Sequence, residues 1–150
     1  MVEDFRDFLA ELVRADVRFL VIGAHALGAH GVPRATVDLD VWIARTPENA
    51  HRVWMALAAF GAPLDALNIQ EADFTRPDVV AQFGLPPYRI DLLTGVSGVS
   101  FDEAWPDRLE ADFGDVRVPF LGRAALIRNK RASGRTKDLA DLESLGASDE

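Results

Sequence analysis

Hydrophobic residues recur along the chain with two different spacings, and these spacings predict alternating helices and strands. Apolar positions three and four residues apart predict a helix over residues 3–14. Thr46 as N-cap and Pro47 at the first helical position predict another helix that ends near residue 60. Alternation or β-branched and aromatic runs predict strands at 17–22, 37–44, 79–83, 88–93 and 116–120. Shorter helices are predicted at 24–29, 101–109, 121–131 and 136–145.

This order of elements predicts an α+β protein, with a mixed β-sheet of about five strands flanked by helices. No repeat, low-complexity tract or linker interrupts the 150 residues. We therefore expect a single domain over residues 1–150, with the C-terminal helices from about residue 121 packed on it. Pro119 lacks a backbone donor for the sheet, which predicts that the strand 116–120 lies at an edge.

Composition narrows the possible functions. The chain contains no cysteine, which excludes disulfides, iron–sulfur clusters and cysteine-ligated zinc. Its formal net charge of −8 argues against a general nucleic-acid coat, which needs a positive surface. The acidic N-terminus lacks the order of a signal peptide, and the apolar run at 19–24 is too short to span a membrane. We therefore expect a cytoplasmic protein without a membrane partner.

Positive charge is concentrated in one segment. Residues 117–137 contain seven basic residues and no acidic one, and they include both lysines of the chain, Lys130 and Lys137. Such a run is either a solvated helical face or an anion site, for example for phosphates.

Three aspartates stand on predicted strands. Asp38 and Asp40 are two residues apart, so their side chains project from one strand face, roughly 7 Å apart. Asp91 lies inside a second apolar strand. If the two strands are neighbours, three carboxylates converge, and Mg²⁺ (or Mn²⁺) prefers such oxygen ligands. The alternative is that each aspartate pairs with Arg34 or Arg89 and serves only solubility or register.

A glycine turn precedes the first two aspartates. A predicted strand ends at Gly23, and a helix starts at once with Ala24. The free N–H groups at a helix N-terminus suit phosphate, and glycine permits a close approach. The glycine spacing matches neither a Walker loop nor a dinucleotide-binding fingerprint. An ordinary strand-to-helix turn is the alternative.

In combination, these elements resemble the signature of the nucleotidyltransferase superfamily, the DNA polymerase β-like fold. The matching residues are Gly23-Ala24 in the turn, Asp38-Leu39-Asp40 on the next strand and Asp91 on a later strand. The surroundings are similar to the branch that contains the AbiEii toxins, through His30-Gly31, Arg34, Thr36, Lys130 and the segment 135–142. The resemblance covers about residues 17–145. Ala24 departs from the usual Gly or Ser, which removes a hydroxyl contact to phosphate.

The resemblance implies an activity and a role for each residue. The activity is Mg²⁺-dependent transfer of an NMP from an NTP to a hydroxyl on a protein, an RNA or a small molecule, with a cognate toxin or antitoxin as a further partner. Asp38 and Asp40 would hold Mg²⁺ and the triphosphate, while Asp91 would complete the metal site and orient or deprotonate the acceptor. The implied nucleotide-binding residues are Gly23, Ala24, Arg34, Thr36, Lys130 and Lys137.

Other interpretations stay open. Ala24 and the short chain fit a catalytically inactive superfamily member that acts as a partner-binding or antitoxin module. Sugar-nucleotide transferases also use Asp-x-Asp with a metal, although the short chain and the early glycine turn fit that class less well. For Lys130, Lys137 and Arg34 the alternative is a surface cation or a structural ion pair. The sequence leaves the NTP base, the acceptor and the oligomeric state open.

Overall fold

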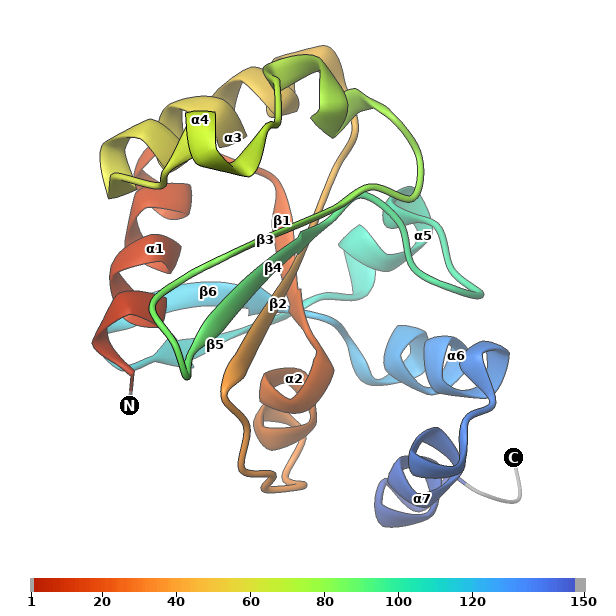
Figure 1. The fold of residues 1–150 in the computed structure, drawn as a ribbon. Coiled ribbons are helices and arrows are strands. Elements are labelled where there is room, and N and C mark those ends of the chain that lie inside the picture. Colours follow the sequence, from red (N-terminus) through yellow and green to blue (C-terminus); the bar gives the residue numbers. More distant parts are fainter. Residues whose placement is uncertain (1, 148–150) are drawn as a thin grey trace.

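In the computed structural model, which describes residues 2–147, six strands form one mixed sheet in the order β3-β4-β2-β1-β6-β5 (Figure 1). The antiparallel pairs are β1–β2, β3–β4 and β5–β6, and two parallel pairs, β2–β4 and β1–β6, join them. The strands are β1 Phe19–Ile22, β2 Asp38–Ile43, β3 Val80–Phe83, β4 Arg89–Leu93, β5 Leu109–Phe113 and β6 Val116–Phe120.

Helices cover both faces of this sheet, with α1 and α3 on one side and α2, α6 and α7 on the other (Figure 1). Within residues 2–147, none of them combines the length and the apolar composition that crossing a bilayer requires. The helices are α1 Glu3–Arg14, α2 Gly23–Ala29, α3 Pro47–Phe60, α4 Leu64–Leu67, α5 Phe101–Ala104, α6 Arg123–Ser133 and α7 Thr136–Ser144, with short 3₁₀ turns η1 Glu71–Thr75 and η2 Trp105–Asp107.

The aromatic part of the core lies between the sheet and the layer of α1 and α3. Phe8 of α1 is fully buried, and its ring centroid is 5.3 Å from those of both Phe60 on α3 and Phe83 on β3. Phe83 pairs with Ile90 of β4, so Ile90 faces the same layer. Because side chains alternate along a strand, Asp91 points to the other face of the sheet.

Local sequence signals explain where α3 begins and ends. The Thr46 hydroxyl accepts a hydrogen bond from the Asn49 N–H (3.2 Å), which satisfies one of the free donors of the first turn. Gly61 ends the helix in the left-handed conformation, with φ +86°, which glycine adopts without strain. The predicted helix over 47–60 is therefore confirmed together with the residues that bound it.

The predicted α+β class is confirmed, and the sheet has one strand more than expected. The predicted helix over 101–109 is wrong beyond its first turns, because α5 ends at Ala104, η2 follows it, and 109–113 form β5. In β5, Leu109, Ala111 and Phe113 are partly buried while the residues between them are exposed. The short helix α4 and the 3₁₀ turn η1 were not predicted. The helix α6 was expected to begin at residue 121 and begins two residues later.

The predicted edge position of the strand 116–120 is wrong. β6 lies between β1 and β5, and β5 forms the edge. The contact of β6 with β1 starts only after Pro119: Phe120 is opposite Val21, and the Leu121 N–H donates to the Val21 carbonyl (2.9 Å). The missing donor of Pro119 therefore interrupts nothing in that part of the ladder.

A buried ion cluster ties α6 to α7. Lys130 Nζ on α6 lies 3.0 Å from a carboxylate oxygen of Asp141 and 3.3 Å from one of Asp138, and both carboxylates are inaccessible to solvent. Arg34, from the segment between α2 and β2, also pairs with Asp141, and Arg135 Nε lies 2.7 Å from Asp138. Burial alone would raise the pKa of the Asp138 carboxyl. Hydrogen bonds from Arg135 and Lys130 outweigh this effect and keep that pKa below its ordinary value.

Removing one carboxylate from this cluster should be costly. We expect Asp141→Asn to lower the free energy of unfolding by about 3–5 kcal/mol, because it leaves the buried Lys130 with half of its compensating charge. The matched control is Glu143→Gln on the same helix, where the side chain is exposed and a change within about 0.5 kcal/mol is expected. Urea denaturation measures both values, and equal stabilities would show that the cluster does not hold α7.

Candidate active site

The three predicted carboxylates lie together on one face of the sheet. β2 and β4 are parallel neighbours, and their register places Asp40 opposite Asp91 and Asp38 opposite Arg89. Strand alternation points all four side chains to the face opposite the layer of α1 and α3. The expectation that the two aspartate-bearing strands pair with each other is therefore confirmed.

Arg89 forms ion pairs with two of the three carboxylates. Its Nε lies 2.8 Å from Oδ1 of Asp91 and its Nη2 lies 3.1 Å from Oδ2 of the same residue, which is a bidentate contact. The same Nη2 donates to Oδ2 of Asp38 at 3.3 Å. The sequence analysis named Arg89 only as a pairing partner of the acids, and this contact is present.

Asp40 is the third carboxylate, and its pKa is raised to about 6. Burial is the largest cause, and the neighbouring Asp91 carboxylate is the next, through its charge and a side-chain hydrogen bond. The positive charge of Arg89 opposes this rise without cancelling it. Asp40 therefore holds a proton at a pH where an ordinary aspartate has lost it.

Gly23 and Asp40 approach each other too closely for any side chain at position 23. Gly23 begins α2 in the left-handed conformation, with φ +68°, and a Cβ built on it would lie 2.4 Å from Oδ2 of Asp40. The glycine that was predicted to let the backbone approach a phosphate thus also makes room for the Asp40 carboxylate. Ala24 follows in the first turn of α2.

The donor chemistry of the site fits a hard divalent cation, but the side chains do not surround one in their present positions. Three carboxylates on adjacent strands supply the oxygen ligands that Mg²⁺ prefers. Nevertheless, within the described part of the chain no three His, Asp or Glu side chains are arranged as a ready ligand set. Arg89 explains the difference, because its guanidinium occupies oxygens of Asp38 and Asp91 that a metal would use.

The four predicted nucleotide-binding residues outside the glycine turn differ from one another in their contacts. They are Arg34, Thr36, Lys130 and Lys137. Lys130 and Arg34 belong to the buried ion cluster, as the structural alternative proposed. The Thr36 hydroxyl accepts from the Asp38 N–H (3.0 Å) and donates to the Asp38 carbonyl (3.2 Å), which fixes the start of β2. Lys137 is exposed on α7. Their contacts with a nucleotide remain predictions.

Most of the basic residues between 117 and 137 are already paired. Arg117 contacts Asp112, Arg128 contacts Glu103, and Arg135 contacts Asp138. Arg123 and Arg131 donate to backbone carbonyls of the last residues of the described chain. The positive charges of this segment are therefore distributed over separate local contacts.

His25 is a half-buried histidine on α2 for which no role was predicted from the sequence. Its ring contacts those of Phe5 (centroids 5.8 Å apart) and Phe113 (5.2 Å), and burial lowers its pKa, so the imidazole is neutral at pH 7. Its Nε2 is buried without a hydrogen-bond partner. The sequence around His25 is short and alanine-rich, and it carries no pattern that would predict these ring contacts or the unpaired Nε2.

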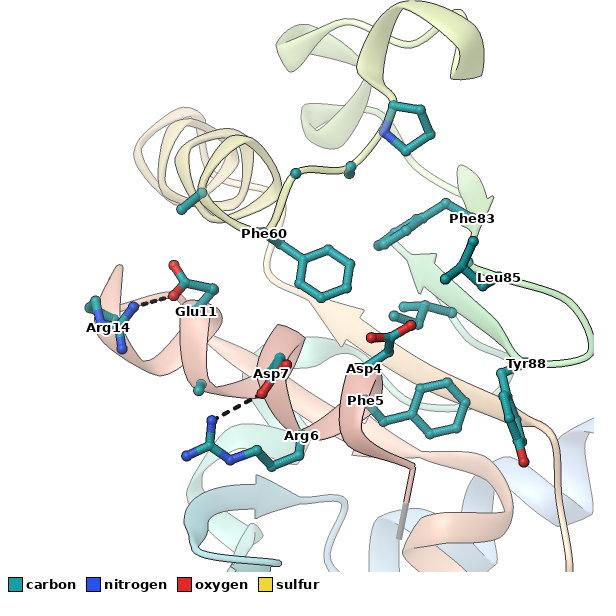
Figure 2. Close-up of a pocket in the computed structure, with 17 residues that line it drawn as sticks. Asp4, Phe5, Arg6, Asp7, Glu11, Arg14, Phe60, Phe83, Leu85 and Tyr88 are labelled. Atoms are coloured by element: carbon teal, nitrogen blue, oxygen red, sulfur yellow. Dashed lines mark hydrogen bonds and ion pairs between the residues drawn. The ribbon is translucent and has the colours of Figure 1, made fainter.

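Two cavities differ in their relation to the carboxylates. Figure 2 shows a hollow of about 560 Å³ between α1, the end of α3 and the β3–β4 turn, with Phe60, Phe83, Leu85 and Tyr88 around it. None of the sequence-predicted site residues lines this hollow, which opens on the α1 side of the sheet. A second cavity of about 460 Å³ is lined by both Asp38 and Arg89, so it reaches the edge of the site.

The close approach of Gly23 to the Asp40 carboxylate predicts that a side chain at position 23 destabilises the protein. Gly23→Ala should lower the free energy of unfolding by about 1–3 kcal/mol, because the new Cβ is strained at positive φ and meets the Asp40 carboxylate. Gly28→Ala on the same helix is the control: its Cβ would meet nothing within 4 Å, so stability should stay equal or rise by up to about 1 kcal/mol. Chemical denaturation measures both, and a neutral Gly23→Ala would refute this packing.

The raised pKa of Asp40 generates a second prediction. Since the unfolded chain has a pKa near 3.8 and the folded protein one near 6, the folded state binds more protons between these values. This contribution to stability is complete below pH 3.8 and is lost as the pH rises to about 6. Without added metal, the wild type should therefore lose stability relative to Asp40→Asn across this range. Denaturation at several pH values tests it, and a constant difference would contradict the shift.

Comparisons with known proteins bear on the fold. No family model matches the chain, and no curated protein sequence matches it. A solved structure, that of a candidate nucleotidyltransferase from Thermotoga maritima, superposes with a TM-score of 0.62 over 93% of this chain and 88% of that one, at 13% sequence identity. At such low identity the likeness is one of fold. The chain described here therefore has a nucleotidyltransferase-like fold, with three aspartates gathered on one face of its sheet.

Proposed function

We propose that this protein is a Mg²⁺-dependent nucleotidyltransferase that transfers an NMP group from an NTP to a hydroxyl of an acceptor. One observation carries the proposal: Asp40 lies opposite Asp91, with Asp38 on the same face, in a sheet of nucleotidyltransferase-like fold. Three carboxylates held this close repel one another, and a bound cation removes that repulsion.

Asp38, Asp40 and Asp91 are the proposed metal ligands, for Mg²⁺ or Mn²⁺. A bound divalent cation would neutralise charge on the phosphates of the NTP. Gly23 and Ala24 bring free backbone N–H groups of the first turn of α2 beside Asp40, where they can donate to phosphate oxygens.

In the transfer, the acceptor oxygen forms a bond to the α-phosphorus, the bond to pyrophosphate breaks, and the hydroxyl loses its proton. Asp91 is the proposed group that orients the hydroxyl or takes the proton. The position of Asp91 directly opposite Asp40 in the register supports this role, because it places a second carboxylate beside the proposed metal ligands.

The basic residues proposed to contact the triphosphate differ in whether they must first break an ion pair. Lys137 is exposed on α7, so its ammonium can bind an anion without first leaving a buried site. Lys130 and Arg34 would first have to give up contacts with Asp141. We therefore rank Lys137 above these two as a phosphate contact. The acceptor classes remain a protein, an RNA or a small molecule, and a toxin–antitoxin setting is part of the proposal.

A second function is an inactive member of this fold that binds a partner protein. Two observations favour it: Ala24 offers phosphate no hydroxyl, and Arg89 already pairs with the carboxylates of both Asp38 and Asp91. If the protein has this second function, we expect no NMP transfer to any acceptor. Substitution of the three aspartates should then leave the binding of the partner protein unchanged.

Substitution of the carboxylates separates the two functions. We expect Asp38→Asn, Asp40→Asn and Asp91→Asn each to lower transfer of an α-labelled NMP at least 100-fold, on the order of the loss expected for a catalytic acid or base. Asp65→Asn, which changes an exposed aspartate of α4 beside α3 (Figure 1), is the control and should leave transfer unchanged. Calorimetry with Mg·ATP is the companion measurement. Unaltered Mg·ATP binding by the Asp38→Asn, Asp40→Asn double variant would refute the proposed site.

A further inference from the structure

Arg89 is the feature of the site that the proposed activity leaves unexplained. Among residues 2–147, it is the cation recorded in ion pairs with the candidate ligands, through Nε and Nη2 to Asp91 and through Nη2 to Asp38. A transferase that must bind a metal on these oxygens thus keeps a permanent positive charge on them. The charge is permanent because the carboxylates, Asp91 first, raise the pKa of Arg89 above a value that is already far from neutrality.

A divalent cation and this guanidinium cannot both use the same oxygens. Each carboxylate has two oxygens, and Arg89 engages both oxygens of Asp91 and one of Asp38. A metal beside the guanidinium would also meet a like charge at short range. Full use of Asp38 and Asp91 by a metal therefore requires the guanidinium to move.

The burial of the partners indicates which of them moves. The Asp91 side chain is 10% exposed and is fixed within the sheet, whereas the Arg89 side chain is 47% exposed at the first residue of β4. Arg89 also lines the cavity of about 460 Å³, which gives its long side chain a place to swing into. Because about half of the Arg89 side chain is exposed, water can solvate its guanidinium once it leaves the carboxylates.

We propose that Arg89 is an internal counter-ion that competes with the divalent cation for Asp38 and Asp91, and that release of its guanidinium to the phosphates of the nucleotide couples metal binding to nucleotide binding. The inference rests on the proposed metal-dependent function. Without a nucleotide, Arg89 keeps the site at a formal charge of −2 instead of −3 and weakens metal binding. With a nucleotide, the freed guanidinium gains an anionic partner, so the two ligands bind with positive cooperativity.

Direct measurement of metal binding tests this inference independently of catalysis. Mn²⁺ affinity is measured by electron paramagnetic resonance for the wild type, Arg89→Gln and Arg89→Lys, with and without pyrophosphate. We expect Arg89→Gln to bind Mn²⁺ about tenfold more tightly than the wild type without pyrophosphate, because the guanidinium no longer competes for Asp38 and Asp91. Pyrophosphate should strengthen Mn²⁺ binding to the wild type more than to Arg89→Gln. Arg89→Lys should be intermediate, since an ammonium cannot make the bidentate contact.

The control is Arg14→Gln, which removes the same charge from an exposed arginine of α1 that pairs with Glu11, on the α1 side of the sheet. Its Mn²⁺ affinity should equal that of the wild type. Thermal denaturation adds a second readout: without metal, Arg89→Gln should melt below the wild type, and Mn²⁺ should raise its melting temperature by the larger increment.

The outcomes are distinguishable. Equal Mn²⁺ affinity of the wild type and Arg89→Gln, with Asp40→Asn weaker than both, would overturn the role of Arg89 and leave the metal site intact. Absence of Mn²⁺ binding to the wild type, Arg89→Gln and Arg89→Lys would overturn the proposed function and this inference together. An equal gain in Arg14→Gln would show that the effect comes from net charge alone.

Discussion

The parallel pairing of β2 with β4 is the constraint on which the candidate site depends. The register sets Asp40 opposite Asp91, and like charges directly opposite each other weaken a sheet. A slip by one residue would separate them, but it would also turn Ile90 and Leu92 out of the core. Burial of these two side chains on the α1 face therefore holds an electrostatically unfavourable cluster on the other face. Arg89 relieves part of that repulsion from within the same strand.

The two strands that carry the site could be predicted because their patterns are strong. β2 alternates, and β4 places Asp91 between Ile90 and Leu92, so both the strands and the facing of their side chains follow from the sequence. β5 could not be identified in the same way. Glu110 and Asp112 are poor strand formers, and the strand is partly buried on one side only. Its stability comes from pairing with β6, which is a tertiary contact.

The roles of the cations could not be predicted, because residues of one type have different surroundings. Lys130 and Lys137 are seven residues apart, yet the first is buried among carboxylates and the second is exposed. The difference arises from Gly134, whose left-handed conformation ends α6 and lets α7 fold back onto it. Likewise, the position of Arg89 opposite Asp38 follows from the strand register and from no local pattern.

The order of the strands in the sheet has a consequence for how the chain folds. Each antiparallel pair joins strands that follow one another in the chain, and the parallel contacts are the seams between these pairs. Contacts between near neighbours close shorter loops and cost less chain entropy, so the seams should close after the pairs have formed. Asp40 belongs to one pair and Asp91 to the next. We therefore expect the acidic cluster to form late in folding, when the β1–β2 pair and the β3–β4 pair come together and their separate charges first meet.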